Sequence, residues 1–392
     1  MAPRRRGPFL KGVIPVNKKN CVLVLLAALC APLTNYRNVL RSILLSAALG
    51  FSVLSVSQSS RARELFVGDV GDNSVKRFDA SSGTYLGAFI APKTAGLKGP
   101  MGMIFTGGQL VVVNQNLGTG QSGEILQFDG ATGTFVGKLV ASSDRNAPFA
   151  PRGIVRGGQD NGFYVADIGA QSSKCSNQGN VKEYDAAGAF LGNLDRQAFT
   201  AEFHPRGVVF GPDGLLYVSA VGCLDPKDPL FNQLTGYVLR FRVDASTGKF
   251  KFFDVFASNT SVPDLHRPEG LVFDSAGNLW VTSFRANASD SDKILKLNGH
   301  TGALLDKLVL APPVASGGKR AYAQAIIFGP GRNLFIPITG DNVTTAGQLR
   351  RCSPTTMQCD VIVPANSAGG ALQQPFYVIF RNTNPATLNY ED

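Results

Sequence analysis

Apolar residues in this chain come in short runs separated by turns rich in Gly, Asp, Asn and Pro. A representative stretch reads Leu271-Val272-Phe273, then a turn from Asp274 to Asn278, then Leu279-Trp280-Val281-Thr282. Short runs of β-branched and aromatic residues bounded by turn residues are typical of β-strands. The pattern therefore predicts an all-β chain built from many short strands.

These strands recur as a repeat with six copies. A full copy opens on Pro-x-Gly followed by an aliphatic residue. A Gly/Asp turn leads into a second strand. A later strand ends in Phe/Tyr-Asp, and an outer turn of the form Asp-x-x-[Ser/Thr]-Gly follows it. Repeats of this length that contain four short strands indicate a β-propeller. The innermost strands are predicted to begin near Met101, Arg152, Arg206, Glu269, Gln324 and Phe376, at intervals of 51 to 63 residues. The last two copies are degenerate, since both have lost the Gly.

The first copy lacks its innermost strand and starts directly at Glu64-Leu65-Phe66. The end of the chain supplies a spare strand, Pro375 to Phe380. If this strand completes the first blade, the ring closes and leaves no long free edge. We therefore expect residues 63–392 to form a six-bladed β-propeller of four-stranded blades, closed by a C-terminal innermost strand.

The net charge of +10 is concentrated in the first 62 residues, which hold nine Lys and Arg and no Asp or Glu. The rest of the chain holds 29 basic and 28 acidic residues. Nucleic-acid binding relies on a basic surface that contacts phosphates, and a nearly neutral domain gives no argument for one. We expect no nucleic-acid partner.

Residues 1–62 are expected to be a leader. Its apolar runs, 22–33 and 43–56, are both shorter than the roughly 18 apolar residues that a membrane-spanning helix needs. The second run follows Arg37 and Arg41 and leads into small residues, as in a secretory signal cleaved between Ser57 and Ala62. A secreted or periplasmic protein is the expectation. A membrane anchor through an uncleaved leader and an organelle transit peptide remain the alternatives.

Four cysteines lie in the predicted propeller, and an even number in an exported chain favours disulfides. Cys352 and Cys359 flank a hairpin-like turn, so we expect them to face each other and form a disulfide. Cys175 and Cys223 each follow the second strand of neighbouring repeats, where a second bridge between loops is plausible. Free thiols are the alternative reading for all four.

Two stretches resemble NHL repeats: Val67 to Asp79, and His204 to Val218. The resemblance covers residues 64–380 and extends distantly to the regucalcin and gluconolactonase-like family. It implies the propeller architecture. It does not imply one activity, because similar propellers host lactonases, lyases, synthases and binding modules.

The residue between Pro and Gly in each copy is expected near the mouth of the central channel. This places Arg152, Arg206, Gln324 and Met101 as candidate ligand-binding residues, together with Glu269. Two arginines near one glutamate can grip an anionic ligand, with the glutamate orienting them. The leading hypothesis is a propeller that binds a small anionic ligand or a protein partner there. An ion-pair network that only plugs the channel is the structural alternative.

A hydrolase or lyase of the lactonase type is the alternative function. The resemblance to gluconolactonases implies a divalent cation held by Glu, Asp and Asn, but Glu269 is the only acid at the Pro-x-Gly positions. Asn114, Asn116 and Asp167 are the further candidate ligands, at the ends of second strands.

Two other enzyme families with similar propellers bear on the same choice. Peptide-amidating lyases place several histidines on zinc, and this chain offers His204 and His266 near innermost strands, with His300 in an outer turn. Strictosidine-synthase-like propellers place a catalytic Glu in the channel, a role that Glu269 beside His266 would imitate. Glu269 and His266 are therefore the candidate catalytic residues. A structural cell-surface repeat protein, without a specific site, is a third reading.

Overall fold

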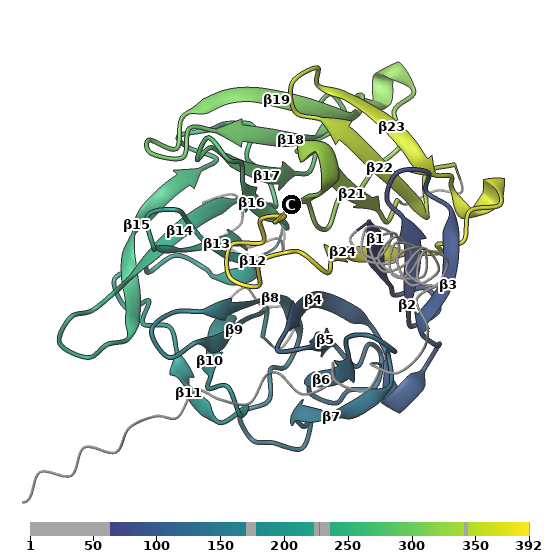
Figure 1. Ribbon diagram of the computed structural model, residues 1–392. Helices are drawn as coiled ribbons and strands as arrows, with labels where there is room; N and C mark the ends of the chain where they lie inside the picture. Colours follow the sequence, from purple (N-terminus) through teal and green to yellow (C-terminus); the bar gives the residue numbers. More distant parts are fainter. Residues whose placement is uncertain (1–62, 170–177, 223–226, 228–235, 341–343, 392) are drawn as a thin grey trace, which may run out of the picture. The chain divides into compact units, whose positions relative to one another are not determined.

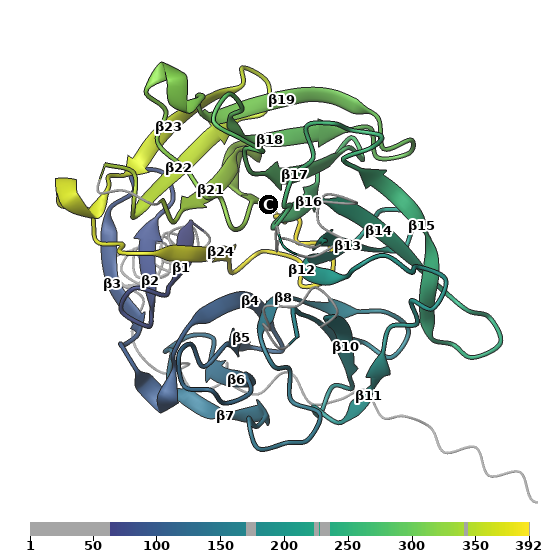
Figure 2. The same cartoon turned by 180° about the vertical axis from the view of Figure 1, so that it is seen from behind.

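The computed structural model describes residues 63–169, 178–222, 227, 236–340 and 344–391. In this part of the chain, 24 strands form six four-stranded antiparallel sheets around a common axis, as Figures 1 and 2 show from opposite sides. The predicted all-β, six-bladed propeller is confirmed. The leader, Cys175 and Cys223 lie outside the described residues.

Each blade runs from an innermost strand at the axis to an outermost strand at the rim. Blade 1 comprises β24 (Pro375–Phe380), β1 (Glu64–Asp69), β2 (Ser74–Asp79) and β3 (Tyr85–Ile90). Blade 2 comprises β4 (Pro100–Thr106), β5 (Gln109–Asn114), β6 (Glu124–Asp129) and β7 (Phe135–Val140). Blade 3 comprises β8 (Pro151–Gly157), β9 (Gly162–Asp167), β10 (Asn180–Tyr184) and β11 (Phe190–Asn193).

The remaining three blades follow the same order from the axis outwards. Blade 4 comprises β12 (His204–Phe210), β13 (Leu216–Val221), β14 (Tyr237–Val243) and β15 (Phe250–Ser258). Blade 5 comprises β16 (Leu271–Phe273), β17 (Leu279–Ser283), β18 (Asp292–Leu297) and β19 (Leu304–Ala311). Blade 6 comprises β20 (Ile327–Phe328), β21 (Leu334–Ile338), β22 (Gln348–Ser353) and β23 (Gln358–Val363). Single 3₁₀ turns lie in connecting loops: η1 (Thr94–Gly96), η2 (Val314–Ser316), η3 (Pro330–Arg332) and η4 (Asn366–Ala368).

The ring closes as the sequence predicts, because β24 pairs antiparallel with β1 and places Leu65 opposite Phe380. Asp69, at the end of β1, reinforces this closure. Its buried carboxylate accepts hydrogen bonds from the backbone N–H groups of Gln373 and Gln374, both at 2.8 Å. The two ends of the propeller are therefore held together by a strand pair and by a buried acid.

The core lies between neighbouring blades, where an aromatic residue of a second strand meets one of the next innermost strand. Such contacts occur at five of the six blade interfaces in the described part of the chain, with ring centroids 4.9 to 6.2 Å apart and edge-to-face geometry. The pairs are Phe66–Phe105, Tyr164–Phe210, Tyr217–Phe273, Trp280–Phe328 and Phe335–Phe380. Each is worth about 0.5–1.5 kcal/mol beyond the burial of its area.

Two innermost strands begin later than predicted. β16 starts at Leu271 and β20 at Ile327, instead of near Glu269 and Gln324. In blade 5, the N–H groups of Glu269 and Gly270 donate to the hydroxyl of Thr282, at 2.9 and 3.0 Å, instead of joining the strand ladder. The residues of the Pro-x-Gly segment therefore precede the regular strand here.

The chain continues after β24 as a segment that the repeat pattern did not predict. Residues 381–391, here called the C-terminal cap, cross the centre of the ring (Figure 1). The carbonyl oxygens of Pro385 and Ala386 accept hydrogen bonds from Arg156 at 2.8 Å and Phe210 at 3.0 Å, near the ends of β8 and β12. Leu388 is 5% exposed and has a φ of 56°. The cap therefore covers the end of the channel where the innermost strands finish.

Cys352 and Cys359 lie directly opposite each other on β22 and β23 and form a disulfide, with Cα atoms 4.0 Å apart. This confirms the predicted bridge. Across the described residues, the structure has no helix with the length and apolar character needed to cross a membrane.

Candidate functional site

The Pro-x-Gly segments bring side chains from different blades to the axis. Between Pro151 and Ile154 the pairing of β8 with β9 shifts register, so Arg152 and Gly153 bulge out of the ladder. A bulge of this kind re-aims a side chain. A Cβ added to Gly153 would lie 2.9 Å from the carbonyl oxygen of Arg206 on the next blade. Glycine thus lets neighbouring innermost strands approach closely, and the residues before each glycine converge.

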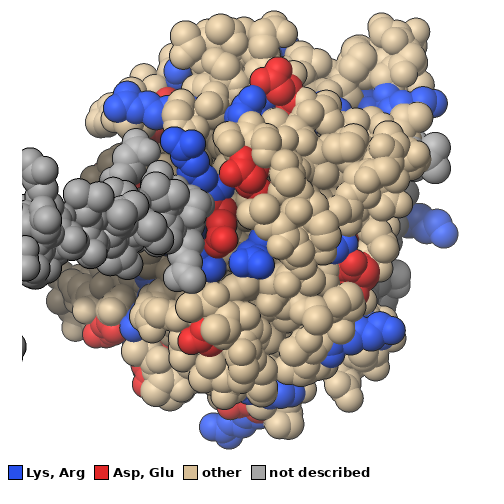
Figure 3. Space-filling model, turned by 45° about the vertical axis from the view of Figure 1, so that its right-hand side comes forward, with Lys and Arg blue, Asp and Glu red and all other residues tan. Residues whose placement is uncertain are grey.

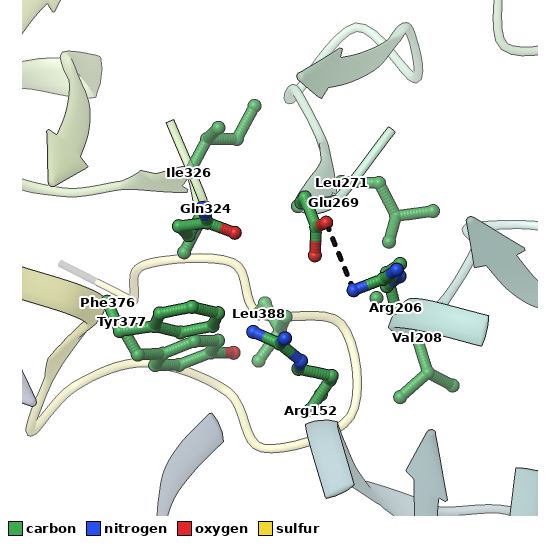
Figure 4. Close-up of a pocket in the computed structure, with 14 residues that line it drawn as sticks. Arg152, Arg206, Val208, Glu269, Leu271, Gln324, Ile326, Phe376, Tyr377 and Leu388 are labelled. Carbon is green, nitrogen blue, oxygen red and sulfur yellow. Dashed lines mark ion pairs between the residues drawn. The ribbon is translucent and has the colours of Figure 1, made fainter. Parts of the chain in front are cut away.

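These residues surround one cavity at the axis, shown in Figure 4. Its volume is about 20 Å³, which is room for roughly one water-sized occupant. Five of the predicted positions lie there: Arg152, Arg206, Glu269, Gln324 and Phe376. Tyr377 and Leu388 also line the cavity and were not predicted. Val208, Leu271, Ile326 and Leu388 supply apolar walls.

The charges in this cavity are not balanced. Arg206 and Glu269 form an ion pair, with Nη1 and Oε1 3.4 Å apart and side chains 13% and 8% exposed. Arg152 has no ion pair with any described carboxylate; its guanidinium lies over the ring of Phe376, 4.6 Å from the centroid. The Nε atoms of both arginines are buried without a hydrogen-bond partner in the described structure. The group as a whole carries one net positive charge.

Arg152 keeps that charge at neutral pH. Burial, helped by repulsion from Arg206 and opposed by Glu269, lowers its pKa to about 10. Arg152 is half-buried and lines the axial cavity, whose volume is about 20 Å³. A buried cation without a counter-charge is unfavourable in a medium of low dielectric constant. The cavity is therefore electrostatically suited to a negatively charged occupant.

Two neutral side chains complete the polar lining. Gln324 offers an amide and Tyr377 a hydroxyl, and Figure 4 shows both beside the opening that the arginines surround. Burial raises the pKa of Tyr377, so its hydroxyl stays protonated and can donate a hydrogen bond. Sequence reasoning missed Tyr377, although it directly follows the predicted Phe376 on β24.

Two of the predicted site residues do not line the cavity. Met101 is 2% exposed and lies behind Arg152, whose Nη1 is 3.8 Å from the methionine sulfur. The backbone N–H of His266 donates to the hydroxyl of Ser283 at 2.9 Å, and burial lowers the pKa of its ring, with a further contribution from Lys293. Catalysis by His266 together with Glu269 stays a prediction; His266 is not among the described residues that line the axial cavity beside Glu269.

The remaining candidate metal ligands are occupied by structural hydrogen bonds. Asn114 accepts from the N–H of Lys98 at 2.7 Å, and Asn116 donates to the carbonyl of Ser122 at 2.7 Å. Asp167 accepts from the N–H groups of Phe149 and Ala150, both at 2.8 Å.

The residues present do not fit the divalent cation that the resemblance implied. Among the described residues, no three His, Cys, Asp or Glu side chains gather as a metal site. The described residues that line the axial cavity include two guanidinium groups and one carboxylate, a set of groups that repels cations.

A larger hollow, of about 610 Å³, lies at the other ends of innermost strands β16 and β20. Asp274, Lys296, Arg332 and Tyr390 are among its lining residues, so the C-terminal cap forms part of its wall. Asp274 is already bonded to the indole N–H of Trp280, at 3.0 Å. On the face that Figure 3 draws, Lys and Arg are interspersed with Asp and Glu, and most residues are uncharged.

No protein-family model matches the chain, and no match is found among curated protein sequences. The resemblance to NHL repeats therefore rests on the motifs quoted above.

Solved structures with similar architecture were found. A luciferin-regenerating enzyme is 15% identical, with 71% of this chain and 81% of that chain covered and a TM-score of 0.49. A gluconolactonase from Xanthomonas campestris is 20% identical, with coverage of 71% and 80% and a TM-score of 0.47. A virginiamycin B lyase from Staphylococcus aureus is 13% identical, with coverage of 77% and 85% and a TM-score of 0.45. The chain is thus distantly similar to gluconolactonases and related propellers, and what those proteins convert is not transferred to it.

Proposed function

We propose that this protein is a binding propeller that holds a small anionic group at its axis. The observation that carries the proposal is Arg152, a half-buried, protonated side chain that has no carboxylate partner among the described residues and lies beside a water-sized cavity. An anion in that cavity would supply the missing counter-charge. The group can belong to a free small anion or to the end of a larger ligand.

Each lining residue has a distinct part in this proposal. Arg152 supplies the uncompensated charge, and Phe376 supports its guanidinium from one side. Glu269 pairs with Arg206 and so fixes the second guanidinium while cancelling its charge. Gln324 and Tyr377 add neutral donors, which give the site direction without further charge.

A lactonase-type hydrolase or lyase is the second candidate. The observation that favours it is Glu269, the only acid among the described residues that line the axial cavity. Its carboxylate is engaged by Arg206. A carboxylate that is paired with a guanidinium group holds that group in place more readily than it accepts a proton as a general base. Ligand binding is therefore the better supported function.

We further propose that the protein is exported, with residues 1–62 removed as a signal. Support comes from the basic and apolar pattern of that segment and from the Cys352–Cys359 disulfide, since stable disulfides belong to oxidising compartments. N-terminal sequencing of the exported protein should begin between residues 57 and 63; a retained Met1 would contradict this.

Anion-dependent thermal unfolding tests the binding proposal. Small anions, titrated at constant ionic strength, should stabilise the protein by about 2.7 kcal/mol at a hundredfold excess over Kd. Arg152→Met should abolish the effect. Arg156→Met is the matched control on the same strand, because Arg156 instead bonds Thr106 and Asn161.

Two results would decide against the proposal. If no anion changes the unfolding temperature of the wild-type protein, the cavity is a structural plug. If the protein turns over lactones and Glu269→Gln abolishes turnover while Arg152→Met does not, the enzymatic alternative is correct.

A further inference from the structure

We infer that the occupant of the axial cavity is a free monatomic halide ion, with chloride as the abundant candidate. The inference rests on the proposed function and narrows it. It excludes the carboxylate, phosphate or sulfate end of a larger ligand. Three properties of the cavity point to a halide: its volume, its net charge and the kind of groups that line it.

The first property is volume. About 20 Å³ are open, enough for one water-sized particle. A carboxylate brings at least three heavy atoms, and a sulfate or phosphate brings five. The buried side chain of Leu388, a residue of the C-terminal cap, bounds the cavity at one end. A single atom is the anion that fits without moving the walls.

The second property is charge. With Arg206 and Glu269 paired at 3.4 Å, Arg152 leaves one positive charge in the cavity. One monovalent anion neutralises it. A divalent anion would replace a buried positive charge with a buried negative one, and water alone would leave Arg152 uncompensated.

The third property is the lining chemistry. Arg152 and Arg206 offer only N–H donors, and the hydroxyl of Tyr377 stays protonated, so it donates too. Gln324 adds a neutral amide, whose N–H groups also donate. Apolar wall is supplied by Val208, Leu271, Ile326 and Leu388. A halide accepts hydrogen bonds from several directions and needs no donor to match a second oxygen atom. This combination of donors on one side and aliphatic groups on the other suits a spherical, weakly hydrated ion.

Glu269 is compatible with this occupant. Its carboxylate faces Arg206, so its repulsion of an anion is offset within the pair. It also limits the net charge to one, and thereby limits the site to one monovalent ion.

The test compares anions of different size and charge on the whole protein. The protein is transferred to sodium gluconate, whose anion is far too large for the cavity, and sodium chloride, bromide, acetate or sulfate is then added at constant ionic strength. Chloride and bromide should raise the unfolding temperature with saturable, single-site dependence, whereas acetate and sulfate should not. Arg152→Met should weaken chloride binding about 10- to 100-fold, as expected for the loss of a charged hydrogen bond, and Arg156→Met should leave it unchanged.

The outcomes separate the two proposals. If acetate or sulfate stabilises as strongly as chloride and Arg152→Met removes the effect, the halide inference is wrong and the proposed anion site stands. If no anion stabilises the protein, both fail. If chloride acts equally on wild type and Arg152→Met, the halide binds elsewhere and the inference is again wrong.

A second measurement does not depend on a variant that folds. Crystals grown in sodium bromide should show one anomalous peak within hydrogen-bonding distance of Arg152 and Tyr377. Anomalous data of adequate strength without that peak would overturn the inference. Should Arg152→Met fail to fold, Arg152→Lys keeps the charge but loses the planar donor fork, and it is expected to bind chloride more weakly than wild type.

Discussion

Single residues at the axis owe their properties to their neighbours. Arg152 and Arg206 occupy equivalent positions in adjacent blades, yet Arg206 has Glu269 in the following blade, while Arg152 has Arg206 there. The order of three residue types around the ring therefore decides which guanidinium is neutralised. The arginine that is left over defines the candidate site.

Replacing Glu269 with Gln should destabilise the protein by about 3 kcal/mol in halide-free buffer, because a second buried guanidinium loses its partner. The same change should tighten anion binding, since the cavity then carries two positive charges. Urea unfolding with and without chloride measures both effects. Glu183→Gln is the control: it removes another buried acid, bonded to Tyr164 at 2.9 Å, without touching the axis. Equal chloride dependence in Glu269→Gln and wild type would refute the prediction.

Stability should fall on acidification through the histidine range. Burial lowers the pKa of His204, which also faces Arg206 and Arg196, and that of His266, which faces Lys293, Asp290 and Arg267. The unfolded chain therefore binds protons more readily than the native state just below the ordinary pKa of about 6.5. The stability that the two neutral histidines contribute is therefore present above about pH 6.5 and is lost as the pH falls towards their lowered pKa values.

This dependence is measurable as the urea midpoint at pH 7.5, 6.5 and 5.5. The midpoint should decrease along that series, and the double change His204→Gln and His266→Gln should flatten the decrease. His300→Gln, in an exposed outer turn, should leave it as in wild type. A midpoint that rises on acidification would contradict the assigned sign.

The repeat predicts which residues lie at the axis, but it does not predict which neighbours each of them contacts. Arg152, Arg206, Glu269, Gln324 and Phe376 share one repeat position, and a ring brings equivalent positions together at its axis. His266 lies three residues before Glu269 in sequence, yet it faces Lys293 instead of the cavity. Sequence proximity is a poor guide there, because the chain turns at Arg267, whose φ is 46°.

At the scale of elements, blade 6 departs furthest from the repeat. Its innermost strand β20 has two residues, and Ala323 contributes only an isolated bridge to Ile338. The Pro and Gly that mark the innermost strands of blades 2 to 5 are both absent in Ala323-Gln324-Ala325, so no sequence signal indicates where this strand starts. The same blade carries the disulfide between β22 and β23.

Removing that disulfide should therefore cost stability where the blade is weakest. Cys352→Ala with Cys359→Ala is expected to lower the free energy of unfolding by about 2 kcal/mol, because the bridge closes only a short loop. Guanidinium unfolding of the variant and of the wild type, without reductant, checks the magnitude. Adding reductant should bring the wild type to the level of the variant and leave the variant unchanged. Equal stability of oxidised and reduced wild type would contradict the prediction.

For the whole molecule, the features that belong to the repeat could be predicted from the sequence, and the segment outside the repeat could not. Six copies predict six blades, and the missing first strand predicts the closure by β24 that the structure has. The C-terminal cap belongs to no repeat. Its backbone bonds to β8 and β12 through Pro385 and Ala386, and the positive φ of Leu388 leaves no signature in composition or periodicity. Only the structure shows that the channel is covered at that end.

Closure by β24 should dominate the stability of the ring. A chain ending at residue 369 loses β24, exposes the edge of β1, and leaves Asp69 without the N–H groups of Gln373 and Gln374. A chain ending at residue 381 keeps all of these and loses only the rest of the cap. Because an open ring leaves one blade with three strands and a free edge, the shorter chain should lose cooperative unfolding, while the longer one should unfold in a single transition at a lower temperature than wild type. Calorimetry distinguishes the two. If both truncations melt like the wild type, β24 is dispensable, and the aromatic contacts between blades that do not involve Phe380 hold the ring without closure.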